Sequence, residues 1–223
     1  MNAEQQFLKD VAEHQMVVIR DDGVNRHIRF KRPGTSCMYF DLITWPGCLC
    51  YTGDMGTYVF QRLEDMFEFF RTDRAYRNEP NKLYINLGYW TEKLIAVDGN
   101  RSGGKVKEFD EDKFRQVINE YRVQWIRDAK ESDSLDKEGR RELWEAVDDE
   151  VLRQLEDGGD RAQHAAYDFS HRPSGNRRYG WSFDDLFEHD FTEYTHSIVW
   201  CCHAIAWGVG LYDKSKALEA VAA

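Results

Sequence analysis

The feature that most constrains the fold is a series of short strand-like segments, separated by turn residues, with no helical pattern between them. Within residues 15–62 these segments read QMVVIRDDGVNRHIRFKRPG, CMYFDLITWPG, CLCYTG and TYVFQR. The first holds two strands around Asp22-Gly23. Gly53 and Gly56 flank a turn at Asp54-Met55, where glycine supplies the positive φ that a reversing chain needs. Four or five strands without intervening helices predict an antiparallel meander.

Helical periodicity flanks these strands. Residues 3–15 and 63–71 carry apolar side chains at helical spacing, and residues 82–97 predict either a further strand or a lining loop. After the glycine-rich connector 98–105, which lacks a phosphate-loop pattern, the chain is helical. We therefore predict an α+β protein. Its N-terminal part (1–97) is an antiparallel β-sheet packed by helices, and its C-terminal half (98–223) is mostly helical and shares one core with the first part.

Several helices are expected in that second half. Phe109, Asp110 and Phe114 predict the first helix start, with Asp110 as N-cap between two stapling phenylalanines. The region from Trp181 to Leu186 repeats this arrangement. The helix at about 136–156 is expected to bury Trp144, Val147, Val151 and Leu155. The last helix, about 190–212, is expected to bury Phe191, Tyr194, Ile198, Cys202, Ile205 and Val209.

The net charge of −10 is concentrated in one segment, because residues 108–160 hold 18 acidic and 9 basic residues. Opposite the apolar stripe of helix 136–156 lies an acidic row. It consists of Glu138, Glu142, Glu145 and Asp149. Like charges at this spacing destabilise a helix slightly. Two interpretations stay open: a solvated face, or a ridge that binds a basic partner.

A basic segment lies in the expected strands 20–32. Its members are Arg20, Arg26, Arg29, Lys31 and Arg32. Four aromatic residues, Tyr39, Trp45, Tyr51 and Tyr58, follow in the next strands. Together these residues would suit a nucleic-acid surface on which bases stack, although the pI near 5.2 opposes this interpretation.

No residue pattern predicts a metal, a cofactor or a catalytic site. A zinc site needs four ligands, so we expect Cys48, Cys50, Cys201 and Cys202 to bind no structural metal. His189, His196 and His203 recur every seven residues, about 10 Å apart along a helix, which is too far to hold one ion. Asp54 has no neighbouring acid or histidine to tune it, so we interpret it as a turn residue.

The cellular setting follows from the cysteines and the apolar runs. Five cysteines, two of them adjacent, indicate free thiols of a reducing cytosol rather than a disulfide framework. No secretion signal is recognised, and the most apolar run, Ile198 to Leu211, is too short for a membrane span.

Two strings, FDLITWPGCLCYTGDMGTYVFQRLEDMFEFFR and FTEYTHSIVWCCHAIAWGVGLYD, resemble a family of uncharacterised accessory proteins of tailed bacteriophages and prophages. The likeness covers roughly residues 26–97 and 181–213 and leaves out the acidic middle. It implies an early-region protein that works in the cytoplasm of the bacterial host. The resemblance transfers no catalytic residue.

Three functions are weighed. The first is a non-enzymatic anti-defence inhibitor, similar to anti-CRISPR proteins and DNA mimics, whose acidic surface binds the basic nucleic-acid-binding surface of a host protein or nucleoprotein complex. The second is a nucleic-acid-binding accessory protein of phage recombination or replication. The third is a nuclease or nucleotide hydrolase that uses Asp54, His171 or His203, which no motif supports.

Overall fold

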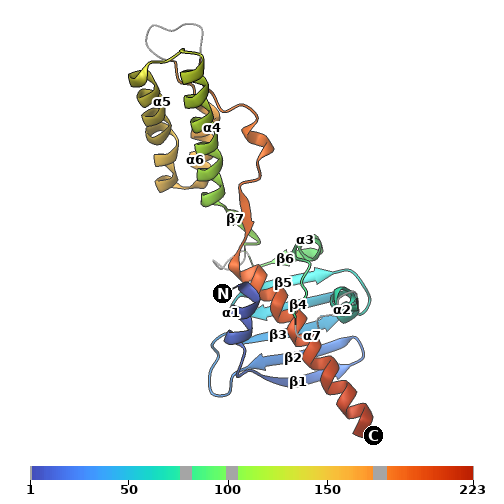
Figure 1. Cartoon of the computed structure of the whole chain (residues 1–223). Helices are drawn as coiled ribbons and strands as arrows, with labels where there is room; N and C mark the ends of the chain where they lie inside the picture. The colour runs from blue at the N-terminus through green and yellow to red at the C-terminus, as the bar shows by residue number, and fades with distance from the viewer. Residues whose placement is uncertain (1, 76–81, 99–104, 173–179, 223) are drawn as a thin grey trace. The chain divides into compact units, whose positions relative to one another are not determined.

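The chain forms two compact units (Figure 1). The computed structural model describes residues 2–75, 82–98, 105–172 and 180–222. Unit 1 comprises Met1–Lys107 and Tyr194–Ala223, and unit 2 comprises Glu108–Glu193. Each unit has a hydrophobic core of its own. Unit 2 is therefore an insertion in the sequence of unit 1.

Unit 1 is built on a six-stranded antiparallel sheet whose strands follow one another in chain order. The predicted meander, and with it the α+β class, is confirmed. Residues 82–97 supply a short helix and the sixth strand. The strands are β1 (Gln15–Asp22), β2 (Asn25–Lys31), β3 (Phe40–Trp45), β4 (Cys48–Gly53), β5 (Gly56–Gln61) and β6 (Leu94–Val97).

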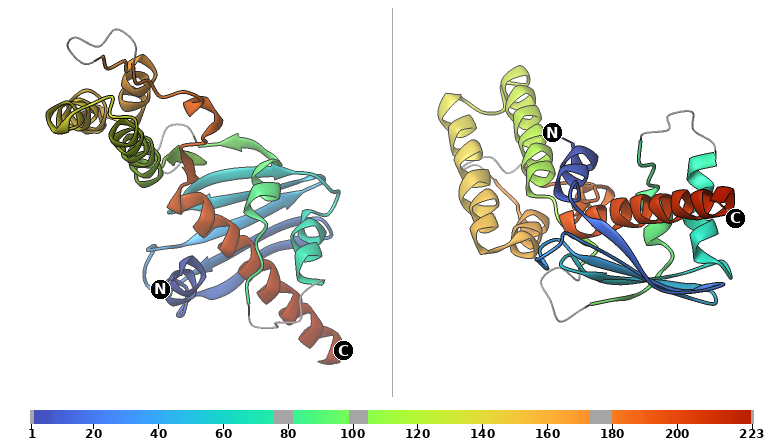
Figure 2. Two further views of the ribbon diagram at one scale, coloured as in Figure 1. Left: turned by 45° about the horizontal axis from the view of Figure 1, so that its top comes forward. Right: turned by 90° about the horizontal axis from the view of Figure 1, so that it is seen from below.

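Helices cover one face of this sheet (Figure 2). They are α1 (Ala3–Asp10), α2 (Met66–Ala75), α3 (Leu87–Thr91) and α7 (His196–Ala222). The long helix α7 runs across the face and contacts the other three. As predicted, the Phe-rich helix and the last helix share one core with the sheet. Its members include Ile28, Phe30, Leu42, Tyr51, Phe60, Phe67, Phe70, Ile198 and Ile205.

The opposite face of the sheet, called the outer face below, follows from strand alternation. In β2 the buried Ile28 and Phe30 alternate with His27 and Arg29, which are only half-buried. The register places Arg29 opposite Asp41, on the neighbouring strand. Beside β2, the outer face thus carries charged residues, whereas the helix-covered face carries Ile28 and Phe30.

The turn at Asp54-Met55 joins β4 to β5, so the predicted hairpin is confirmed. Gly56 has φ +107°, where L side chains are strained. Gly53 is needed for a different reason, because a Cβ there would lie 2.2 Å from the Tyr39 carbonyl oxygen. Asp54 joins the turn to the loop before β3 by accepting a 2.5 Å hydrogen bond from the Met38 backbone N–H.

Unit 2 is helical around an aromatic core. Its elements are α4 (Glu111–Glu131), α5 (Lys137–Glu150), the 3₁₀ helix η1 (Leu152–Asp157), α6 (Gly159–Asp168) and the 3₁₀ helix η2 (Leu186–Glu188). The predicted start of α4 is confirmed: Asp110 accepts a 2.8 Å hydrogen bond from the Lys113 N–H. The rings of Phe109 and Phe114 lie 5.5 Å apart, as a hydrophobic staple requires. Strands β7 (Lys107–Phe109) and β8 (Thr192–Tyr194) pair where the chain leaves unit 1 and returns to it.

The expected division at residues 97 and 98, with one shared core, differs from the structure. The contacts divide the chain at 107/108 and 193/194, and the two clusters of buried residues are separate. The physical reason is the last helix: it buries its apolar residues on the sheet of unit 1, which leaves residues 108–193 to close a core among themselves.

Four local expectations are wrong. Trp144 is 37% exposed and Leu143 is buried in its place, whereas Val147, Val151 and Leu155 are buried as expected. The helix expected over 136–156 ends at Glu150 and continues as 3₁₀. The expected helix start at 181–186 yields only the three-residue η2, because Asp185 adopts φ +60° and its side chain caps nothing. The last helix begins at His196 rather than about 190, after β8.

Candidate interaction surfaces

The two units differ sharply in charge. Unit 2 contains 24 acidic and 13 basic residues, a net of −11, whereas the remainder of the chain contains 16 acidic and 17 basic residues, a net of +1. The excess of negative charge therefore belongs to the inserted unit alone. A surface of one charge sign orients and accelerates the approach of an oppositely charged partner.

The predicted acidic row lies on the exposed side of α5, called the acidic face below. Its four members, Glu138, Glu142, Glu145 and Asp149, are all exposed. Arg141 lies within ion-pair distance of Glu138 and Glu145, and Arg153 Nη2 lies 2.7 Å from Asp149 Oδ1. Glu142 has no ion pair among the described residues. Exposed ion pairs contribute little free energy, so a basic partner can displace Arg141 and Arg153 from these carboxylates.

A stacked pair of side chains joins α4 to α5 beside this face. The guanidinium carbon of Arg122 lies 3.7 Å from the centre of the Trp144 ring. Arg122 Nη1 also donates a 2.5 Å hydrogen bond to Asp148 Oδ1. Arg122 is almost buried, and Trp144 covers it. This contact explains why Trp144 is only partly exposed although it does not belong to the buried stripe.

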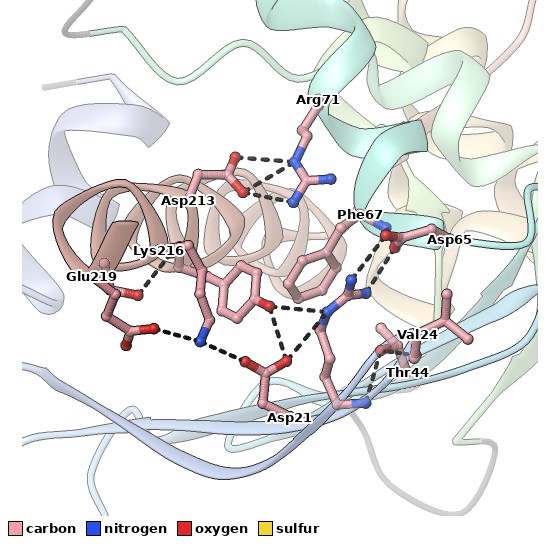
Figure 3. A network of polar contacts seen from close by, with 12 residues as sticks. Asp21, Val24, Thr44, Asp65, Phe67, Arg71, Asp213, Lys216 and Glu219 are labelled. Carbon is pink, nitrogen blue, oxygen red and sulfur yellow. Dashed lines mark hydrogen bonds and ion pairs between the residues drawn. The ribbon is translucent and has the colours of Figure 1, made fainter. Parts of the chain in front are cut away.

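A network of polar contacts lies in unit 1, where α2 and α7 meet the strand pair β1–β2 (Figure 3). Arg26 donates from Nη1 and Nη2 to the two carboxylate oxygens of Asp65, at 2.8 and 2.9 Å. The Tyr212 hydroxyl donates to Asp21 Oδ1 at 2.9 Å, and Lys216 Nζ lies 2.8 Å from Asp21 Oδ2. A second ion pair joins Arg71 of α2 to Asp213 of α7, with Nη2 and Oδ1 2.6 Å apart.

The network stabilises the ionised form of its acids. Burial raises the pKa of Asp65, but the hydrogen bonds from Arg26 and from the Phe67 N–H outweigh it and hold the pKa below the usual value. The guanidinium of Arg26 also lies over the Phe67 ring, 4.7 Å from its centre. Arg26 is buried and bonds to Asp65, Tyr212 and Asp21 within the described part of the chain, so the network docks helices on the sheet. The alternation of β2 could have indicated from the sequence that Arg26 is a buried residue, because it shares its face with Ile28 and Phe30.

The five basic residues of the segment 20–32 do not form one surface. Arg26 lies on the helix-covered face, whereas Arg29 and Lys31 lie on the outer face. Arg20 pairs with Asp22, Arg32 with Glu13 and Arg29 with Asp41. Lys31 is exposed and has no ion pair among the described residues. The five residues therefore form no single basic patch, because strand alternation separates them and acids neutralise most of them.

The expected stacking platform of four aromatic residues is also wrong. Tyr51 and Tyr58 are completely buried in the core of unit 1, where their rings lie 6.2 Å apart. Tyr39 is half-buried, and Trp45 is 40% exposed. A strand places alternate residues on opposite faces, so neighbouring strands direct these side chains both ways.

Among the residues that the structure describes, no three His, Cys, Asp or Glu side chains are grouped so as to hold a metal ion. Cys201 and Cys202 are buried, and burial raises the pKa of both thiols. His203 donates from Nδ1 to the Val199 carbonyl at 2.9 Å, and its burial lowers its pKa. The backbone of His171 pairs with that of Trp181.

Within the described ranges, no helix combines the length and the apolar character needed to cross a membrane. Comparison with known proteins finds no match to the chain among family models, curated proteins or solved structures. The candidate surfaces therefore rest on the geometry and charge of this chain alone.

Proposed function

We propose that this chain is a non-enzymatic binding protein whose inserted helical unit presents an acidic surface to a basic partner. The partner is a host protein or nucleoprotein complex with a basic nucleic-acid-binding surface, and binding there would block that surface, as an anti-defence inhibitor does. The resemblance of two strings of the sequence to accessory proteins of tailed bacteriophages and prophages supports an activity in the cytoplasm of a bacterial host. Unit 1 serves as the scaffold from which the acidic unit is inserted.

The observation that carries the proposal is the segregation of charge. Unit 2 holds a net charge of −11 and the rest of the chain +1. The acidic face adds four exposed carboxylates on one helix, of which Glu142 is without an ion pair among the described residues. Exposed charge costs a helix some stability through repulsion, so its concentration favours a role in binding.

The test reverses the acidic face. Replacing Glu138, Glu142, Glu145 and Asp149 by Lys should lower the association rate with the partner captured from host lysate by about tenfold or more. The difference should shrink as salt is raised, because screening acts beyond about 8 Å at physiological ionic strength. Surface plasmon resonance at low and high salt measures both effects.

A matched control reverses four exposed acids of unit 1. The residues are Glu13, Asp22, Glu64 and Glu92. This variant changes the net charge equally, so it separates a specific face from an effect of total charge. Circular dichroism should show both variants folded, since exposed pairs contribute about 0.3–0.5 kcal/mol each. Equal association rates for the α5 variant and the unmodified protein would show that the acidic face is only a solvated surface and does not bind the partner.

A further inference from the structure

A separate polar surface lies on the outer face of the sheet of unit 1, where β2 leads into β3. A pocket of about 490 Å³ opens there, and β2 and the loop after it supply its whole lining. The lining residues are Arg29, Lys31, Gly34, Thr35, Ser36 and Tyr39. Small-molecule sites usually measure roughly 300–1,000 Å³. The pocket is therefore of a size that holds one small ligand.

Hydrogen bonds to Asp41 hold the side chain of Arg29 in the lining of this pocket. Its Nε and Nη2 each donate a 2.8 Å hydrogen bond to the carboxylate of Asp41, whose side chain is only 6% exposed. His27 Nε2 donates to the same carboxylate at 2.8 Å. Nη1 of Arg29 has no partner among the described residues. A guanidinium fixed in this way keeps a charged donor free for a ligand at little further cost in side-chain entropy.

The other lining groups are donors too. Lys31 lies two residues further along β2, on the same face, and has no partner among the described residues. The Thr35 hydroxyl accepts a 3.0 Å hydrogen bond from the Cys37 N–H, which leaves its own proton to donate. The Ser36 hydroxyl lies beside it in the loop. Asp41 neutralises the charge of Arg29, so the net positive charge of the lining comes from Lys31, and Arg29 contributes the N–H donors of its Nη1. A cation beside N–H and hydroxyl donors suits a phosphate group.

We propose that this pocket binds a phosphate-bearing ligand of the size of one nucleotide. The phosphate lies against Arg29 Nη1, Lys31 and the Ser36 hydroxyl, and the half-buried ring of Tyr39 supports the apolar part of the ligand. The site lies within unit 1 and uses no residue of the acidic face, so it is independent of the proposed function.

Titration calorimetry with adenosine monophosphate, inorganic phosphate and adenosine tests the site. We expect adenosine monophosphate to bind, inorganic phosphate to bind more weakly, and adenosine not to bind. Lys31→Glu should lower the affinity for adenosine monophosphate about tenfold or more, because a charged donor is replaced by a repelling acid. Lys31→Arg should restore it to within about threefold. Lys9→Glu, the same charge change on an exposed position of α1, should leave it unchanged.

The opposite results overturn the proposal. If the unmodified protein does not bind adenosine monophosphate, the pocket is not a binding site. If Lys31→Glu and Lys9→Glu lower the affinity equally, the binding is an effect of net charge and not of this pocket. Oligonucleotides that bind through Lys31 with affinity rising with length, while adenosine monophosphate fails to bind, would assign the pocket to a nucleic-acid strand instead. The variant with the reversed acidic face should bind adenosine monophosphate normally, so failure of this site and failure of the acidic surface can be told apart.

Discussion

Two arginines three positions apart in β2 show how much the role of a residue depends on its face. Arg26 points to the helix-covered side and is held by Asp65, Tyr212 and Asp21. Arg29 points to the outer face, where one carboxylate holds one edge of its guanidinium and leaves the other edge open. The first side chain docks helices on the sheet, and the second lines a pocket.

At Gly208, α7 lies in close contact with the sheet. A Cβ at this position would lie 2.9 Å from Leu42 Cδ1 and 3.0 Å from Phe30 Cζ, both of them buried. We expect Gly208→Ala to destabilise unit 1 by about 1–3 kcal/mol, because the core must move to accept a methyl group. Urea unfolding measures the change.

Gly88→Ala is the control for this substitution. Gly88 lies in α3, and its nearest neighbour to an added Cβ is the Tyr194 hydroxyl at 3.9 Å. We expect Gly88→Ala to be neutral or slightly stabilising, as alanine favours helix. A neutral Gly208→Ala would show that α7 can move away from the sheet at no cost.

At the scale of elements, α7 is the centre of unit 1. From Ile198 to Val209 it is buried on almost every side, since the sheet lies beneath it and α1, α2 and α3 lie around it. Its last turns are different, with Leu218 72% and Val221 88% exposed. The change occurs at Tyr212 and Lys216, which tie the helix to β1 through Asp21. The polar network therefore marks the end of the buried part of the helix.

This network predicts that acid loosens the docking of α7. The pKa values of Asp21 and Asp65, both members of this network, are lowered in the folded protein. An acid with a lowered pKa contributes stability above its unfolded pKa, and that stability is lost as pH falls through the folded pKa. We expect the unfolding free energy of unit 1 to fall once the pH drops below about 4.

Asp65→Asn separates this effect from general acid denaturation. The variant should be less stable at neutral pH, because Arg26 loses its paired carboxylate, and its stability should depend less on pH between about 5 and 2. Hydrogen exchange of the β2 amides, followed by mass spectrometry across this range, gives the slope. An unchanged slope would mean that Asp65 ionises alike in the folded and unfolded chains.

At the scale of the whole molecule, the insertion of unit 2 leaves the two ends of unit 1 adjacent. The Thr195 N–H donates to the Val106 carbonyl at 3.1 Å, and the Thr195 hydroxyl donates to the Lys105 carbonyl at 2.8 Å. A short linker can therefore replace residues 108–193. The aromatic core of unit 1 contains no residue of unit 2, so its burial does not depend on the insertion.

We expect unit 1, made as residues 1–107 joined to 194–223 by a short glycine-serine linker, to fold without unit 2. It should unfold cooperatively on heating and should keep the binding of adenosine monophosphate. It should lose the binding that depends on the acidic face. Circular dichroism and calorimetry check the first expectation. A chain without a cooperative transition would show that unit 2 is needed for the fold of unit 1.

Local pattern was enough to predict most of the elements. The alternating strands from residue 15 to 61, the turn at Asp54-Met55 and the capped start of α4 were all predicted correctly, since each depends on residues close together in the chain. The exposure of Glu142 and its neighbours on α5 was also predicted. The same reasoning failed for Trp144, because its stacking on Arg122 joins residues 22 positions apart.

By itself, the sequence determined the meander, the capped start of α4 and the concentration of negative charge after residue 107. Only the tertiary structure decided on which face of the sheet each arginine of β2 lies. It also decided that Tyr51 and Tyr58 are core residues and where the two units divide. The contacts that settle these points are long-range: Arg26 meets Asp65 across 39 positions and Tyr212 across 186. Such contacts depend on the packing of α7 against the sheet, and no local periodicity encodes which partners that packing brings together.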